Sequence, residues 1–361
     1  MNENLENDIL GFDPTQLSVF NEPESNKSAG DPLIYKPAPE KSKSEDGIYR
    51  STIKIIYNPF NLRTSILEQQ SYAMQDKDGY FSVVSSLTVN DTKSCPVFNA
   101  WKKCRYAEEG SVLWLQQAPR DKGGKQLFDK RFARYVTIQV MEDDNQPELV
   151  GKYLFWKLPK SIWDIINAKM NPTDPKKAPI PVMDFLFGRS VDLEVIPGPD
   201  DKAHPERKKR ETKYMGELSE DTVSCTNPDG SPLLNDEEQD ILDEYVSAMQ
   251  KVWKCKDPEE RKELLNEVNA QENTKELKKI YSKVLEQIKK FCPDLVEHLG
   301  YKEIPEDKMK RIQAWIDIVL SGNDPASVGN VPEAAKVIEE EVTSGVEVSA
   351  EDDSDDDDLP F

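Results

Sequence analysis

The sequence predicts a protein of the α+β class: a small β-barrel or sandwich, followed by an all-α module and an acidic tail. Residues 48–215 hold short runs of β-branched and aromatic residues separated by turn signals, which is typical of small barrels and sandwiches. Residues 235–320 carry apolar residues at helical spacing. Residues 321–361 are low in complexity and acidic, so we expect a disordered tail.

Five strands are expected in the first region, because its apolar runs are short and rich in Val, Ile, Tyr and Phe. Their expected ranges are 51–57, 80–89, 135–141, 151–158 and 191–196. The pair Asp78-Gly79 supplies a turn signal before the second strand. The run Pro197-Gly198-Pro199 stops the fifth strand.

One helix is expected between the fourth and fifth strands. Pro159 suits a first helical position, because its fixed φ angle and missing N–H fit there. Ile162, Trp163 and Ile166 follow at helical spacing. Trp163 lies on this apolar stripe and is therefore predicted to pack in the core.

Four helices with short loops are expected between residues 235 and 320, which makes a compact helical module. Three of their starts are marked by Asp236, Pro258 and Glu306, and a further run covers residues 275–291. The polar segment 216–234 is expected to be a linker. The module is predicted to serve either as an interaction platform or as a brace over a binding groove.

The net charge is −21, from 47 Lys and Arg against 68 Asp and Glu, and as a total it argues against a nucleic-acid binder. The charge is segregated, however. Residues 1–49 sum to −6, residues 50–215 to +6, residues 216–330 to −10 and residues 331–361 to −11. The predicted strand region is therefore basic within an acidic chain. Residues 1–47 are expected to form a flexible acidic arm, or an arm for a partner or for self-association on DNA that orders on contact.

Several function classes are not expected. No apolar run approaches the length of a membrane helix, and Met1–Leu10 lacks the basic region of a signal peptide. The 5 cysteines are odd in number and sparse, which favours a reducing cytoplasm. With only 2 histidines a His-based triad is weakened, and Gly123-Gly124-Lys125 lacks the spacing of a phosphate loop. We expect neither an enzyme nor a cofactor.

Cations and aromatic residues interleave in the basic region, and both are needed to bind a single nucleic-acid strand, which offers bases to stack on and phosphates to neutralise. The alternative for any one aromatic is simple core packing. Because alternation puts Phe155 and Trp156 on opposite faces of a strand, one can pack in the core while the other stays free to stack. The expected DNA-binding residues are Lys102, Lys103, Arg105, Tyr106, Arg120, Lys122, Lys125, Lys130, Arg131, Phe132, Arg134, Tyr135, Trp156, Lys157, Lys160, Arg207, Lys208, Lys209, Arg210, Lys213 and Tyr214.

The C-terminal end combines an acidic run with an apolar tip. The Phe361 ring and its own carboxylate suit a pocket lined by Arg or Lys on a partner, with the upstream acids steering it. The expected partner-binding residues are Asp355, Asp356, Asp357, Asp358, Leu359, Pro360 and Phe361.

Two segments resemble a known family. Ser94-Cys95-Pro96-Val97, and GKYLFWKLPKSIWDIINAKM at Gly151–Met170, are similar to the core of the T-even-phage single-stranded DNA-binding protein. The resemblance covers about residues 50–215 and implies an oligonucleotide-binding (OB) barrel with a groove for single-stranded DNA. It further implies action in phage DNA replication, recombination and repair, in the cytoplasm of the bacterial host. The tip resembles the ends of bacterial single-stranded DNA-binding proteins, which recruit genome-maintenance enzymes; Leu359 replaces their Ile.

The chain departs from the T-even family in two places. The family has a zinc subdomain with His and Cys ligands, and here Cys95 keeps one ligand position while Phe98, Tyr72 and Ser85 stand at the other three. We therefore expect no metal, with apolar packing around Phe98 in its place. The family's basic self-association arm is replaced by the acidic segment Met1–Gly30.

Two other functions remain open from the sequence. Stacking platforms accept both nucleic acids, so an OB-fold binder of single-stranded RNA is the first alternative. The second is a DNA mimic that inhibits a host protein, against which the basic region argues.

Overall fold

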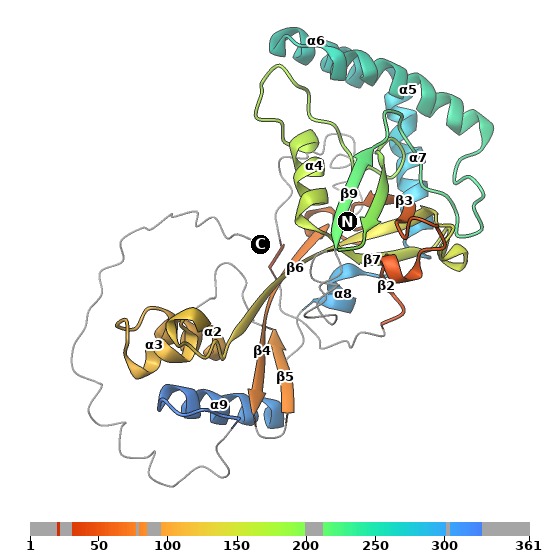
Figure 1. Ribbon diagram of the computed structural model, residues 1–361. Helices are drawn as coiled ribbons and strands as arrows, with labels where there is room; N and C mark the ends of the chain where they lie inside the picture. Colours follow the sequence, from red (N-terminus) through yellow and green to blue (C-terminus); the bar gives the residue numbers. More distant parts are fainter. Residues whose placement is uncertain are drawn as a thin grey trace. The chain divides into compact units, whose positions relative to one another are not determined.

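The computed structural model describes residues 20–21, 31–76, 79–84, 95–198, 212–300 and 304–326 (Figure 1). The chain divides into two compact units. The sheet unit comprises Met1–Met74, Ser82–Asn99 and Phe128–Pro305, and the small unit comprises Gln75–Phe81, Ala100–Leu127 and Glu306–Phe361. Most of the predicted acidic arm, strand residues 85–89, the run Arg207–Arg210 and the tail from residue 327 lie outside the described residues.

In the described part of the chain, nine strands join in one sheet, and most pairings are antiparallel. The strands are β1 (Phe20–Asn21), β2 (Ile34–Tyr35), β3 (Tyr49–Ile56), β4 (Ile66–Asp76), β5 (Gly79–Val84), β6 (Asp129–Glu142), β7 (Tyr153–Lys157), β8 (Ser190–Ile196) and β9 (Lys213–Leu218). The main path runs β1-β4-β6-β3-β8-β9, with β5 beside β4, β7 beside β6 and β2 beside β7. The α+β class is confirmed.

The expected barrel is not observed in the described residues. Closure of a sheet requires its two end strands to pair with each other. Here β9 pairs with β8, and β1 at the other end of the path pairs with β4, so the path stays open. The prediction of a closed barrel is therefore corrected to an open, mixed sheet.

Strand β6 organises the sheet, because three strands pair with it. Val136 stands opposite both Ile66 of β4 and Trp156 of β7, and from Thr137 onward β3 takes the place of β4 along the same strand. This long strand was expected only over residues 135–141. Its first half, which reads DKRFAR, is too polar to be recognised from a hydrophobic pattern.

Strands β3, β7 and β8 match the predicted ranges closely, and β5 matches the start of the predicted second strand. Besides the two-residue strands β1 and β2, the sequence did not predict β4 and β9. Strand β4 carries Glu68, Gln69 and Gln70 in its middle and so lacks an apolar run. Strand β9 is a half-exposed edge strand, in which Lys213 and Glu217 face solvent. Edge strands commonly carry such charges. An edge strand is therefore difficult to recognise from a hydrophobic pattern.

The predicted helix after β7 is α4 (Lys160–Met170), which buries Ile162, Ile166 and Met170. Pro159 precedes the helix as its N-cap and does not occupy the first helical position. Trp163 is half-buried rather than fully in the core.

The four predicted later helices are observed, and in the described residues a further short helix, which the sequence did not predict, lies between the last two of them. They are α5 (Asp236–Lys254), α6 (Pro258–Ala270), α7 (Glu272–Ile288), the short α8 (Leu295–Leu299) and α9 (Glu306–Leu320). The start of α5 is fixed by a capping box, in which Asn235 and Glu238 each bind the backbone N–H of the other. No helix in the described residues is long and apolar enough to cross a membrane.

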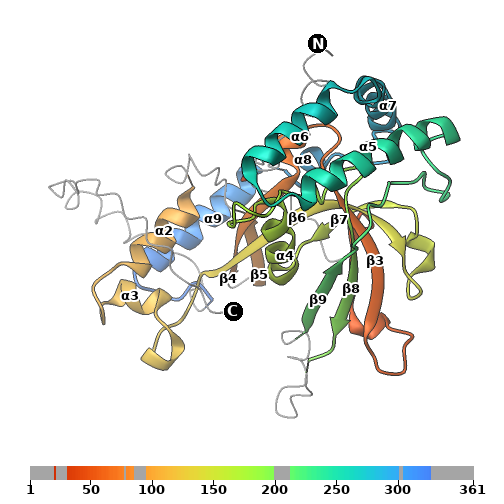
Figure 2. The same ribbon diagram turned by 90° about the horizontal axis from the view of Figure 1, so that it is seen from above.

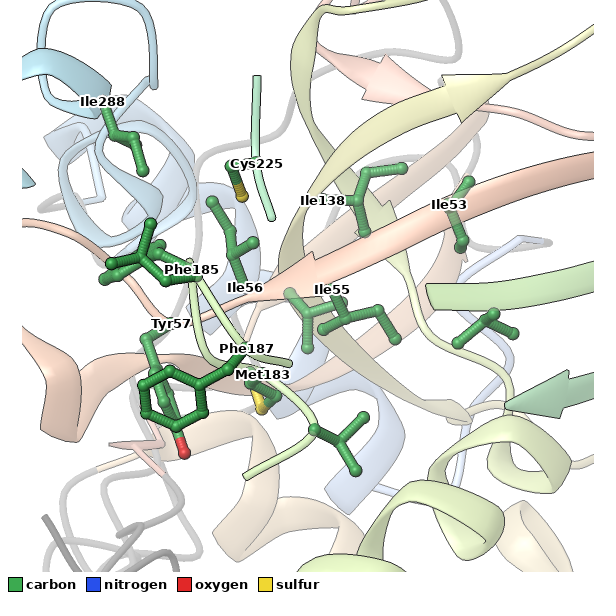
Figure 3. Packing of buried hydrophobic residues seen from close by; sticks show 14 of the residues in the cluster. Ile53, Ile55, Ile56, Tyr57, Ile138, Met183, Phe185, Phe187, Cys225 and Ile288 are labelled. Atoms are coloured by element: carbon green, nitrogen blue, oxygen red, sulfur yellow. The ribbon is translucent and has the colours of Figure 1, made fainter. Parts of the chain in front are cut away.

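One buried cluster joins the strands of the sheet unit to α4, α5 and α7. Figure 3 shows Ile55 and Ile56 of β3 near Phe185, with Ile288 of α7 and Cys225 in the same cluster. The segment predicted as a linker contributes Cys225, Leu233 and Leu234 to this cluster. Helices α5, α6 and α7 thus share their hydrophobic core with the sheet, whereas α9 belongs to the small unit.

The small unit is built from the end of the β4–β5 hairpin, α9 and two helices that the sequence did not predict, α2 (Pro96–Arg105, from Ala100 onward) and α3 (Val112–Gln117). Arg311 of α9 donates two hydrogen bonds to Asp76, at 2.7 and 2.8 Å, and lies 4.4 Å from the ring centroid of Phe81. The indole of Trp315 donates to the carbonyl of Gln75 at 2.8 Å. These contacts fasten α9 to the hairpin.

Candidate nucleic-acid interface

The structure divides the predicted DNA-binding residues between the two units. Those in the sheet unit are Lys130, Arg131, Phe132, Arg134, Tyr135, Trp156, Lys157, Lys160, Lys213 and Tyr214. Those in the small unit are Lys102, Lys103, Arg105, Tyr106, Arg120, Lys122 and Lys125. Arg207, Lys208, Lys209 and Arg210, together with the tip Asp355–Phe361, lie outside the described residues.

An exposed aromatic ring stands on β6. Phe132 is 49% exposed, and the guanidinium carbon of Arg134 lies 5.5 Å from its ring centroid. The same carbon lies 4.9 Å from the ring centroid of Trp163 in α4. Arg134 also donates from Nε to the carboxylate of Glu68, directly opposite on β4, at 2.7 Å. The charge of Arg134 is therefore neutralised by Glu68. Its guanidinium positions the ring of Phe132 and is not available to bind a phosphate.

Two cations lie on the other face of the same strands. Arg131 and Tyr135 alternate with Phe132 and Arg134 along β6, and Lys157 of β7 stands opposite Tyr135. Arg131 and Lys157 are both exposed. Partial burial, and then the positive charge of Arg131, lower the pKa of Lys157. Two like charges held close together favour an anion beside them.

The first half of β6 also has an open edge. Strand β7 pairs with β6 from Tyr135 to Gln139, whereas Asp129–Ala133 pairs with β4 on its other side. In the part of the chain that the structure describes, no strand pairs with Asp129–Ala133 along the β7 side. A flexible polymer that follows this edge can reach the ring of Phe132 on one face and Arg131 on the other.

Both aromatic residues of β7 are buried, contrary to the expectation that one stays free. Trp156 is 2% exposed and belongs to the main cluster. Phe155 packs with Leu295 and Leu299 of α8, and its ring centroid lies 5.1 Å from that of His298. Because β7 is covered on both faces, alternation does not expose either ring. Trp156 is accordingly assigned to the core and not to base stacking.

The remaining predicted contacts of the sheet unit lie near the start of α4 and on β9. Lys160 is exposed and forms an ion pair with Asp164 at 3.5 Å. Lys213 is exposed, while Tyr214 packs against the main cluster. Burial, and then the charge of Glu40, raise the pKa of Tyr214. Tyr214 is therefore more a packing residue than a free stacking platform.

The small unit carries a second basic surface with an exposed ring. Lys102, Lys103 and Arg105 are exposed in the last turn of α2, where cations also stabilise the helix dipole. Tyr106 follows, is 72% exposed and meets Trp101 edge to face at 6.3 Å.

The loop after α3 adds more cations to the small unit. Arg120, Lys122 and Lys125 are all exposed, and Gly123 turns the chain between them with a φ of 79°. Lys122 pairs with Glu109 at 3.3 Å, so the loop and the end of α2 lie close together. The small unit therefore holds six of the predicted cations and the exposed ring of Tyr106.

The positions compared with a zinc site do not form a metal cluster in the described residues. Tyr72 and Cys95 are buried in the sheet unit, and burial, followed by the charge of Cys95, raises the pKa of Tyr72. Ser85 lies outside the described residues.

The structure also shows a role for Glu68 that the sequence did not indicate. Glu68 positions Arg134, and this contact exists only because β4 pairs with β6.

Comparison with models of known protein families and with curated proteins finds no match for this chain.

Proposed function

We propose that this protein binds single-stranded DNA without catalysing a reaction, and that it coats and protects exposed strands during replication, recombination and repair. Binding residues of both kinds needed by a strand, a stacking ring and nearby cations, occur together in each unit. The family resemblance of the segment Gly151–Met170 supports the same proposal.

The observation that carries the proposal is the pair of exposed rings beside cations. Phe132 projects from a sheet edge that also presents Arg131 and Lys157, and Tyr106 projects among the cations of α2. An exposed large aromatic residue costs free energy in water, and a stacked base would remove that cost. A duplex hides its bases inside the helix, so this arrangement favours single strands.

The acidic tail has two proposed uses. Its charge of −11 over residues 331–361 would compete with DNA for the basic surfaces when DNA is absent. Its tip, Asp355–Phe361, would recruit replication and recombination proteins. The host cytoplasm is the proposed location.

A fluorescence titration of the full chain with labelled oligonucleotides tests the proposal. The expected result is strong preference for a single strand over a duplex of the same sequence, with a log–log salt slope of about −0.7 for each phosphate neutralised. Equal affinity for both, or affinity independent of salt, would refute it. Competition with an RNA of the same sequence decides between the two nucleic acids.

Deletion of residues 331–361 tests the tail. Affinity for single-stranded DNA should rise, because the competing charge is removed. Unchanged or lower affinity would refute competition while leaving strand binding itself untouched. Removal of Phe361 alone should leave DNA affinity unchanged and abolish capture of partner proteins.

A further inference from the structure

A pocket of about 690 Å³ lies in the sheet unit, apart from the open edge of β6. Its walls come from the C-terminal half of α4, from β9 and the turn after it, and from the end of α5; Figure 2 shows these elements. Its volume falls in the range of sites for small molecules. None of the predicted DNA-binding residues lines it.

Arg189, just before β8, lines the pocket and supplies a guanidinium group to it. Its Nη1 is buried and has no hydrogen-bond partner among the described residues. Burial lowers the pKa of Arg189, while the carboxylates of Asp221 and Glu220 act in the opposite direction without touching it. Arg189 as a whole is only half-buried, so its guanidinium can still donate to an acceptor bound in the pocket that it lines.

Two further cations line the same pocket. Lys169 comes from α4 and Lys254 from the end of α5, and both are exposed. Within the described residues neither ammonium group forms an ion pair or a side-chain hydrogen bond, unlike Lys160 of α4 and Lys283 of α7. Together with Arg189 they provide three donors for one anionic group.

The pocket also offers an aromatic wall. The guanidinium carbon of Arg189 lies 5.8 Å from the ring centroid of Trp253 in α5. The apolar side chains of Ile180 and Val182 line the pocket as well. A planar ring can therefore stack on the indole while an attached anion meets the three cations.

The rim carries charge of the opposite sign. Glu217, Glu220 and Asp221 line the pocket and are exposed, and no hydrogen bond to any of these three carboxylates occurs among the described residues. Carboxylates repel an anion but accept hydrogen bonds from hydroxyl groups. A simple anion would contact the cations of this pocket but not its carboxylates or its aromatic wall. A ligand with an anionic end, a planar ring and free hydroxyl groups would use all of it.

We propose that this pocket binds a nucleoside monophosphate. The phosphate lies between Arg189, Lys169 and Lys254, the base stacks on Trp253, and the sugar hydroxyls donate to Glu220 or Asp221. The site is separate from the proposed strand-binding surfaces and does not depend on them.

Isothermal titration of the full chain with AMP tests this assignment. We expect saturable binding that is weakened about tenfold or more when the phosphate is removed, as in adenosine, or when the base is removed, as in inorganic phosphate. The 2′-deoxy analogue, dAMP, should bind more weakly than AMP because one donor to the rim carboxylates is gone. A saturating single-stranded oligonucleotide should not displace AMP.

Two variants tie the binding to this pocket. Arg189→Met removes a half-buried charge whose Nη1 has no hydrogen-bond partner among the described residues, so the chain should fold, and AMP binding should fall about tenfold or more. Trp253→Leu should weaken AMP without changing the affinity for inorganic phosphate. Lys152→Met, at an exposed lysine outside the pocket, is the matched control and should leave AMP binding unchanged.

Three results would overturn the proposal. They are the absence of saturable AMP binding, AMP binding by Arg189→Met equal to that of the unmodified chain, and displacement of AMP by the oligonucleotide. The last two would mean that AMP binds elsewhere. Because strand binding is measured separately, none of these results would by itself refute the proposed function.

Discussion

Arg134 on β6 and Glu68 on β4 stand directly opposite each other, and the guanidinium donates to the carboxylate at 2.7 Å. Both side chains are mostly buried. The guanidinium also lies over the rings of Phe132 and Trp163. One ion pair thus ties together two strands, a helix and the exposed ring that the proposed function uses.

Replacing Arg134 by Met should lower the free energy of unfolding by about 1–3 kcal/mol, because Glu68 would keep its burial and lose its partner. Urea denaturation measures this loss. The double variant Glu68→Gln/Arg134→Met should recover part of it. Arg50→Met is the matched control, since the ion pairs of Arg50 with Asp46 and Glu194 are exposed. A loss no larger than that of the control would contradict the prediction.

Replacing Phe132 by Ala should weaken binding to single-stranded DNA by roughly 5- to 100-fold, as expected for the loss of about 1–3 kcal/mol from one stacked base. Stability should hardly change, because the ring is half exposed. The oligonucleotide titration measures the affinity. Phe60→Ala removes another exposed phenylalanine, 40% exposed, and should leave binding unchanged. Equal effects of the two substitutions would argue against stacking at Phe132.

The double variant Arg131→Gln/Lys157→Gln should reduce the magnitude of the salt slope by about 0.7 for each phosphate that is no longer neutralised. The physical reason is that fewer counterions are released when fewer phosphates meet a cation. Lys152→Gln, at an exposed lysine away from these two, is the control. An unchanged slope in the double variant would mean that other cations bind the phosphates.

Alkaline pH should destabilise the fold through its buried thiols. Burial raises the pKa of Cys225 to about 12, from an ordinary value near 9. The unfolded chain therefore loses this proton first, and stability declines as pH rises from about 9 toward 12, by roughly 1 kcal/mol per pH unit for a fully buried thiol. Urea midpoints at pH 7, 9 and 10 measure the decline. Cys225→Ala should make the decline less steep, because burial also raises the pKa of Cys104 and Cys292. An equally steep decline in that variant would rule out Cys225 as a contributor.

Periodicity predicted the elements whose pattern is visible within a single segment. Strands β3, β7 and β8 are rich in β-branched or aromatic residues, and α5, α7 and α9 each bury one apolar stripe. In these elements local propensity agrees with the final environment.

Elements that depend on a partner were missed. Strand β4 has a polar middle, yet Gln69 is buried, because its amide donates to the carbonyl of Leu299 at 2.6 Å. Nothing near Gln69 in the sequence indicates a carbonyl 230 residues away. The same holds for Phe155 and Trp156, since the cover on one face of β7 comes from α8.

By itself, the sequence determined the segregation of charge, the α+β class and most helices, because these follow from composition and from local spacing. Only the tertiary structure decided that the sheet stays open, that Trp156 is buried while Phe132 is exposed, and that Arg134 is neutralised by Glu68. Exposure and pairing depend on neighbours contributed by distant segments, and a residue's own sequence context does not contain them.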